Sequence, residues 1–191
     1  MYCTPSELRE YLGITVTTDD SLLSALLNAS KNLIDRYTGR TFEADSDTIR
    51  YFDSYRNVDG VLLYLDADLC VITSITNGGG ASVAGSNYVT EPRNSTPYYA
   101  IRLKPSSTVN WQSSSNGDTE NAIAITGRWA YSTKAPDIIN HACKRLAAYL
   151  YRQKDNANDL DRAVVAGNST ILPSQIPSDI RLMLESYKVI Q

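Results

Sequence analysis

A stripe of apolar positions at helical spacing runs through the segment 18–38. Its members recur every three or four residues, and polar residues such as Asn28 and Asp35 fall on the opposite side. The stripe consists of Leu23, Leu26, Leu27, Ser30, Leu33, Ile34 and Tyr37. This pattern predicts an amphipathic helix that lies on a core and keeps one face in water. Gly39 can adopt the left-handed conformation that closes a helix, and Phe42 would then fold back over the last turn.

Three further helices are predicted from the same kind of pattern. The residues Thr4-Pro5-Ser6-Glu7 have the form of a capping box with a proline at the first helical position, and they start a helix that ends near Gly13. Helical period returns after Pro136 and continues to near Lys154. The apolar face of this third helix consists of Ile138, Ile139, Ala142, Cys143, Leu146, Ala147 and Leu150. A last helix covers about 177–189, and its stripe consists of Ile180, Met183, Leu184 and Tyr187.

Alternating apolar and polar positions replace the helical period from about Glu43. Six candidate strands follow, separated by turn-rich stretches such as Asn77-Gly78-Gly79-Gly80. They are 48–55, 61–65, 71–76, 87–90, 98–104 and 122–130. Several short strands at this spacing are typical of a compact antiparallel barrel or sandwich.

Together these elements predict an α+β fold class: a mainly helical bundle of about four helices with an inserted antiparallel β subdomain. Residues 1–42 and 131–191 would form the discontinuous bundle domain, and residues 43–130 the β-rich insertion. Neither half of the bundle would be complete alone.

Length and composition indicate a folded, soluble protein. The chain has 191 residues, of which 42% are hydrophobic and 20% charged. Its longest apolar run, 61–65, is far below the roughly 18 residues of a membrane span, and its start lacks the pattern of a secretion signal, so we expect it in the cytoplasm of a host cell. Cys3, Cys70 and Cys143 have no CxxC spacing, which favours three reduced thiols over disulfides or a zinc site.

The net charge of −3 is unevenly distributed along the chain. Lys and Arg number 4 against 5 Asp and Glu in residues 1–42, 6 against 10 in 43–130, and 8 against 6 in 131–191. An acidic chain is a poor match for a protein that grips nucleic acid, because that affinity comes largely from Lys and Arg displacing counterions. The third helix carries a small basic face, which could meet DNA or an acidic partner, although solvated helix faces look the same. It consists of Lys144, Arg145, Arg152 and Lys154.

No residue pattern indicates a catalytic or metal site. His141, the single histidine, has no motif that supplies a nucleophile or acid, which favours a solvated or subunit-contact role. Asp66 and Asp68 could be imagined as paired carboxylates or calcium ligands, but the EF-hand spacing is absent. The run 78–80 lacks the Lys-Ser/Thr of a phosphate-binding loop, and we interpret it as a hairpin loop.

Two features suggest contacts with other proteins. Thirteen Tyr stand against two Phe, and tyrosine is favoured at protein interfaces, although it also suits half-exposed strands. The polar segment 155–176 contains apolar Val164, Val165, Ile171 and Leu172, which solvent exposure explains poorly. We expect an inter-ring or inter-subunit contact there; the alternative is a loop that folds back on its own subunit.

The order of several short motifs resembles a known family. The helix that ends in Asp35-Arg36-Tyr37-Thr38-Gly39-Arg40-Thr41-Phe42, the strand end Gly127-Arg128-Trp129-Ala130-Tyr131, and the closing Ile176-Pro177-Ser178-Asp179-Ile180 carry the likeness. In this order they resemble the head-tail connector (adaptor, or head completion) proteins of long-tailed bacteriophages, in the longer form with an inserted β region.

This resemblance implies a structural virion protein at the head-tail interface, without catalytic, cofactor or metal-binding residues. It implies a ring, expected to be dodecameric, beneath the portal protein, which joins the DNA-filled capsid to a head-closure or tail protein. DNA would pass through the channel without sequence-specific binding, and no membrane would be involved. We expect contact residues among Tyr37, Arg40, Phe42, His141, Arg145, Arg152, Val164, Val165, Ile171, Leu172 and Tyr187.

Three alternatives stay open at this point. A carbohydrate-binding or adhesive β domain is suggested by Trp111, Trp129 and the many tyrosines. A hydrolase would need a carboxylate pair that the sequence does not reveal. Within the viral class, a head-closure or tail-completion protein is the nearest alternative.

Overall fold

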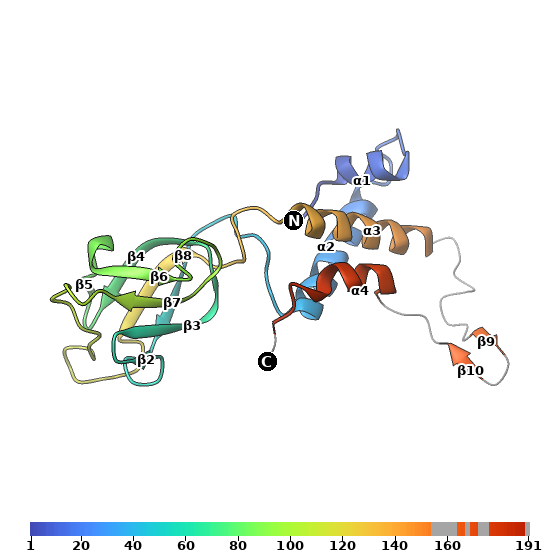
Figure 1. Cartoon of the computed structure of the whole chain (residues 1–191). Coiled ribbons are helices and arrows are strands. Elements are labelled where there is room, and N and C mark those ends of the chain that lie inside the picture. Colours follow the sequence, from blue (N-terminus) through green and yellow to red (C-terminus); the bar gives the residue numbers. More distant parts are fainter. Residues whose placement is uncertain (154–163, 167–168, 172–175, 190–191) are drawn as a thin grey trace. The chain divides into compact units, whose positions relative to one another are not determined.

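The computed structural model describes residues 1–153, 164–166, 169–171 and 176–189 (Figure 1). The chain forms two compact units. The helical unit comprises Met1–Arg40 and Ala135–Gln191, and the β unit comprises Thr41–Lys134. In the described part of the chain, no helix is both long and apolar enough to cross a membrane.

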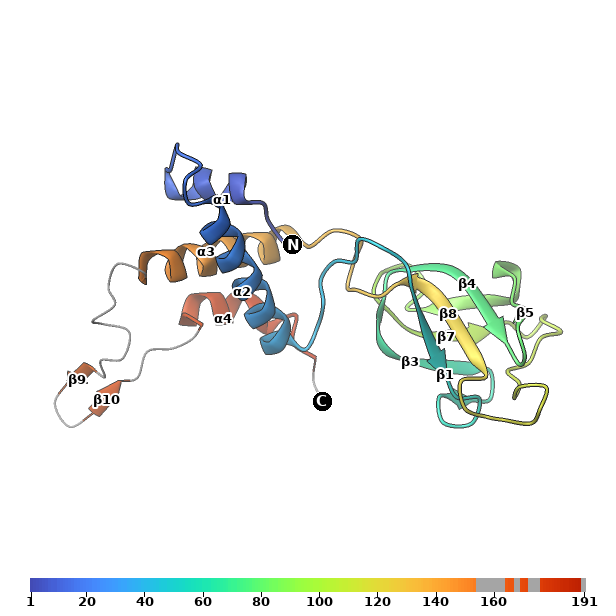
Figure 2. The same ribbon diagram turned by 180° about the vertical axis from the view of Figure 1, so that it is seen from behind.

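Four helices make up the core of the helical unit. They are α1 (Pro5–Leu12), α2 (Asp20–Thr38), α3 (Asp137–Gln153) and α4 (Ser178–Glu185). Helix α3 contacts the other three and lies between α1 and α4 (Figure 1, Figure 2). The apolar side chains buried on these helices are Leu8, Leu23, Leu27, Ile34, Ile139, Ala142, Cys143, Leu146, Ala147, Ala148, Ile180 and Leu184. Their 3-and-4 spacing is the pattern from which the helices were predicted.

The predicted helix ends of α1 and α2 are confirmed. The Glu7 N–H donates to Thr4 Oγ1 at 3.2 Å and the Thr4 N–H donates to Glu7 Oε2 at 2.6 Å, which completes the capping box. Gly39 closes α2 at a φ of +71°, and its N–H donates to the Asp35 carbonyl at 2.8 Å. Helix α4 ends at Glu185, four residues before the predicted end, because the Val189 N–H donates to the Thr38 carbonyl of α2.

Two antiparallel sheets of four strands each form the β unit. The first has the order β1 (Thr48–Phe52), β8 (Ile123–Arg128), β4 (Val71–Asn77) and β5 (Ala81–Ser82). The second has the order β2 (Val58–Asp59), β3 (Leu62–Leu69), β7 (Tyr98–Leu103) and β6 (Tyr88–Glu91), and a short 3-10 helix, η1 (Gly85–Asn87), leads into β6. The six predicted strand segments are confirmed as β1, β3, β4, β6, β7 and β8.

A single hydrophobic core lies between the two sheets. Both sheets contribute to it: Phe52, Leu63, Leu69, Ile75, Val83, Ile101, Leu103, Ile123, Ile125 and Trp129. The Trp129 indole N–H donates to the Thr48 carbonyl at 3.1 Å, so this large side chain is buried with its polar atom satisfied. Buried Asn77 joins a loop to the sheet, because its amide donates to the Asn110 carbonyl at 2.7 Å and accepts from the Gln112 N–H at 3.0 Å.

A further pair of strands lies between α3 and α4 in the chain. Strands β9 (Val164–Ala166) and β10 (Ser169–Ile171) pair antiparallel.

The prediction of a mainly helical bundle is wrong. The described residues contain roughly equal amounts of helix and strand: four helices, two four-stranded sheets and the pair β9 and β10. Strands β2 and β5 have two residues each, too few for an alternating pattern, and they form by pairing with β3 and β4. The shorter α4 also reduces the helical share.

Candidate partner-binding surfaces

The C-terminal end of α2 and the segment after α4 form a basic hollow of about 460 Å³. We call it the α2-end hollow; it is lined by Arg36, Tyr37, Thr38, Gly39, Glu185, Lys188 and Val189. The Tyr37 hydroxyl donates to Glu185 Oε2 at 2.8 Å, and Lys188 Nζ lies 5.2 Å from the centre of the Tyr37 ring. The hydrogen bond to Glu185 raises the pKa of Tyr37, so its hydroxyl stays a neutral donor.

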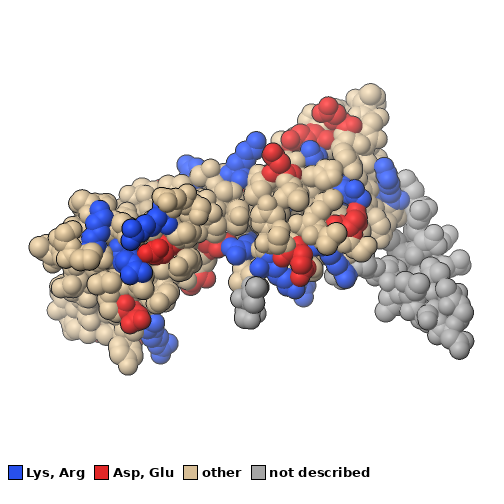
Figure 3. Space-filling model, in the orientation of Figure 1, with Lys and Arg blue, Asp and Glu red and all other residues tan. Residues whose placement is uncertain are grey.

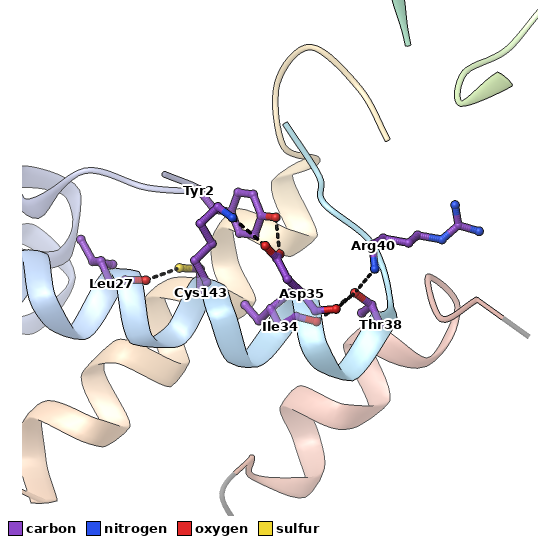
Figure 4. Close-up of polar contacts among 8 residues, drawn as sticks. Tyr2, Leu27, Ile34, Asp35, Thr38, Arg40 and Cys143 are labelled. Carbon is purple, nitrogen blue, oxygen red and sulfur yellow. Dashed lines mark hydrogen bonds and ion pairs between the residues drawn. The ribbon is translucent and has the colours of Figure 1, made fainter. Parts of the chain in front are cut away.

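Hydrogen bonds at the end of α2 fix the backbone where it leaves the helix, next to this hollow (Figure 4). Buried Thr38 donates from Oγ1 to the Ile34 carbonyl at 2.8 Å and accepts from the Arg40 N–H at 3.3 Å. The Arg40 Nε–H donates to the Tyr187 carbonyl at 2.8 Å. Three predicted contact residues, Tyr37, Arg40 and Tyr187, are therefore brought together here.

A second hollow, of about 380 Å³, lies where α1, α3 and α4 meet. We call it the α3–α4 hollow; its lining is Tyr11, Arg145, Ala148, Tyr149, Arg152, Pro177, Asp179 and Ile180. Arg145 forms an ion pair with Asp179, whereas Arg152 is exposed. Two predicted contact residues, Arg145 and Arg152, thus share one surface that also carries two tyrosines.

His141 lies beside the same hollow on α3. Its ring is exposed and lies 6.2 Å from the Tyr11 ring in an edge-on arrangement. Figure 3 shows acidic and basic side chains interspersed over the visible face of the helical unit. This mixture favours specific contacts over general attraction to a polyanion.

The remaining predicted contact residues fall in different places. Phe42 has no exposed surface; it lies in the β unit with its ring 5.7 Å from that of Tyr131. Val164 and Val165 are in β9 and Ile171 is in β10, whereas Leu172 lies outside the described residues.

The β unit exposes large side chains that the sequence analysis did not single out. Ile49 and Tyr51 on β1 are 54% and 59% exposed. Alternation along 48–52 indicated that these two share one face, but it could not indicate that this face is turned away from the core. The two tryptophans form no exposed platform, since Trp129 is buried and the half-buried Trp111 donates to the Val61 carbonyl at 3.1 Å.

The candidate chemical groups have structural partners. A hydrogen bond with Cys3 and burial raise the pKa of the Cys143 thiol, which leaves it protonated and a weak nucleophile. Asp66 pairs with Arg50 at 3.0 Å. Gly78–Gly80 join β4 to β5 with positive φ angles, so the predicted hairpin loop is confirmed. Among the described residues, no group of three or more His, Cys, Asp or Glu could hold a metal ion.

The chain is similar to one protein family and to several solved structures. A family model described as "HCP: Head completion protein" matches residues 2–190. Twelve chains of solved structures match, and no curated protein sequence does. A chain of "Neck of empty GTA particle computed with C6 symmetry" has a TM-score of 0.60 and 14% identity, over 100% of this chain and 91% of that chain.

Two further solved structures are similar to this chain. "Virion of native gene transfer agent (GTA) particle" has a TM-score of 0.61 and 15% identity over 100% of this chain and 91% of that chain. "Neck of native GTA particle computed with C12 symmetry" has a TM-score of 0.60 and 15% identity over 97% and 88%. At these identities the likeness shows a shared fold.

Proposed function

The chain belongs to the head completion protein family, and we propose on that basis that it assembles as a ring, expected to be a dodecamer, beneath a portal. Its role is that of a structural virion protein at the connection between head and tail. The observation that carries this conclusion is the family match, which spans nearly the whole chain. The ring would join the filled capsid to the tail or to the next connector, and DNA would leave through its centre.

The finer parts of this proposal have separate support. Neck structures with the same fold are described with C6 and C12 symmetry, which supports a ring. A net charge of −3 suits a channel wall that DNA must pass without adhering. Membership of a family of structural virion proteins supports a role without a chemical step.

We assign contacts with portal or tail proteins to the two hollows of the helical unit. Each combines arginine with tyrosine around a concave surface, and both residues are enriched at protein interfaces. Arg152 is the residue of choice for a test because it is exposed and lines the α3–α4 hollow.

The test is addition of the purified chain to DNA-filled, tailless capsids that lack it, followed by electron microscopy with averaging about the portal axis. A ring of new density at the portal vertex is the expected result. Binding only to capsids that already carry another connector would assign the chain to the head-closure position. Absence of binding to an exposed portal would refute the proposal.

Variants of the chain test the α3–α4 hollow in the same assay. Arg152→Glu should weaken capsid binding at least about tenfold, since it replaces the exposed cation of the hollow with an anion. Arg93→Glu is the matched control, because Arg93 is exposed on a loop of the β unit and its reversal changes the net charge equally. Equal loss in both variants would show that net charge, and not the hollow, governs binding.

A further inference from the structure

The whole net charge of the chain lies in the β unit. Residues 41–134 contain 7 Lys and Arg against 10 Asp and Glu, a difference of −3, whereas the remaining residues contain 11 of each. Copies of the same acidic unit that are brought together in a ring repel one another. An uncharged surface between them would add nothing to this repulsion, so it suits the place where copies approach most closely.

The outer face of the first sheet is such a surface. Figure 2 shows the strands β1, β8, β4 and β5 of this sheet. Cross-strand partners share one side of a sheet, so the pairings of these strands define rows of neighbouring side chains. One row is Tyr51, Ala124, Thr76 and Ser82, and the next is Ile49, Thr126 and Ser74. We call these seven residues the two-row face. None is charged, and all are exposed or half-buried.

Alternation along β1 keeps Arg50 off this face. Arg50 lies between Ile49 and Tyr51 in sequence, but its side chain pairs with Asp66 and its guanidinium carbon lies 4.9 Å from the centre of the Trp129 ring. At the end of the face, Arg128 and Asp47 pair with each other at 3.5 Å.

We propose that the two-row face packs against a second copy of this chain within the ring, an inference that rests on the proposed ring assembly. Ile49 and Tyr51 supply exposed apolar area at the β1 edge, and tyrosine is among the residues that dominate interface energies. The serine and threonine hydroxyls behind them can exchange hydrogen bonds without adding charge. Ring closure requires that the face meets a different patch of the neighbouring copy.

A positive charge introduced on the two-row face distinguishes burial of this face from an effect of charge repulsion alone. Tyr51→Lys lowers the negative charge of the β unit, so it would leave association unchanged or favour it if repulsion alone mattered. If the face is buried between copies, the ammonium group must be desolvated, and ring formation on tailless capsids should fall at least about tenfold.

Tyr55→Lys is the matched control. Tyr55 is 81% exposed in the turn after β1, outside the two rows, and its replacement changes the charge equally. Ring formation by Tyr55→Lys should equal that of the wild type. A comparable loss in Tyr55→Lys, or rings from Tyr51→Lys at wild-type yield, would overturn the proposal.

A crosslinking measurement keeps the test independent of folding defects. A photoreactive phenylalanine derivative at position 51 preserves an aromatic side chain, and irradiation of assembled particles should join two 21.1 kDa chains. Density for the ring without such a self-crosslink would overturn this inference and leave the proposed function standing. Absence of the chain from the neck would overturn both.

Discussion

Substitution of Gly127 by alanine tests the register at the centre of the first sheet. Gly127 lies on β8, paired with Thr48 of β1 and Ile72 of β4. A Cβ atom at this position would lie 2.1 Å from the Val71 carbonyl oxygen and 3.0 Å from Leu69 Cδ1. Because the 2.1 Å contact is to backbone, no side-chain rotation can relieve it, and the two strands must separate.

Separation of the two strands should lower the free energy of unfolding of the β unit. Overpacking of a dense core typically costs about 1–3 kcal/mol, and each ladder hydrogen bond lost with the adjacent pairs adds about 1 kcal/mol. A total of roughly 3–5 kcal/mol is a large fraction of the about 5–15 kcal/mol by which a small domain is stable. With a urea m-value of about 1.5–2 kcal/mol/M, the unfolding midpoint should fall by about 2 M.

Tryptophan fluorescence during urea unfolding measures this change in the β unit alone. Both tryptophans of the chain, Trp111 and Trp129, lie in that unit. Gly85→Ala is the control, because a Cβ at Gly85 meets nothing within 4 Å and its φ is ordinary. Its free energy of unfolding should stay within about 0.5 kcal/mol of the wild type or rise slightly. A Gly127→Ala midpoint within about 0.3 M of the wild type would refute the described approach of β8 to β4.

Four further predictions concern single contacts. Asn77→Ala should lower the free energy of unfolding by about 2 kcal/mol in the fluorescence assay, since it leaves two loop backbone groups unpaired; an unchanged midpoint would contradict this. Ser30→Ala should raise the melting temperature seen by circular dichroism, because the buried Ser30 hydroxyl has no partner among the described residues, and a lower value would argue against it. A backbone hydrogen bond at the α1 cap holds the pKa of Glu7 below its ordinary value of 4.5. The ionised carboxylate therefore stabilises the fold above that pH, and this stabilisation is lost as the pH falls through the lowered pKa. On acidification, Glu7→Gln should lose less free energy of unfolding than the wild type, and equal losses would exclude the effect. A double-mutant cycle of Arg145→Ala and Asp179→Ala should give a coupling free energy of unfolding of at most about 1 kcal/mol, because both side chains are roughly two-fifths exposed. A much larger coupling would mean that the ion pair is shielded from solvent.

The family resemblance and the structural virion role were predicted from the sequence and are confirmed by the family match. The evidence for them was local order: a helix ending at Gly39, a strand ending in Gly127-Arg128-Trp129, and a closing Pro177-Ser178-Asp179. Such motifs survive in sequence because caps and turns depend on residues only a few positions apart.

The balance of helix and strand could not be obtained in the same way. Strands β2 and β5 exist because hairpin pairing with β3 and β4 satisfies their backbone groups, which no pattern in two residues can indicate. Likewise α4 stops early because Val189 bonds to Thr38, far away in the sequence.

The sequence by itself determined the four helices and six of the strands, where α1 begins and where α2 ends, because those choices rest on spacing, caps and glycine conformation within one or two turns. Only the tertiary structure decided that Tyr37 meets Glu185 across 148 residues and that Ile49 and Tyr51 lie on the outside of their sheet. The reason is physical: a period of two names the two faces of a strand, but the side that is buried depends on which other strands cover it.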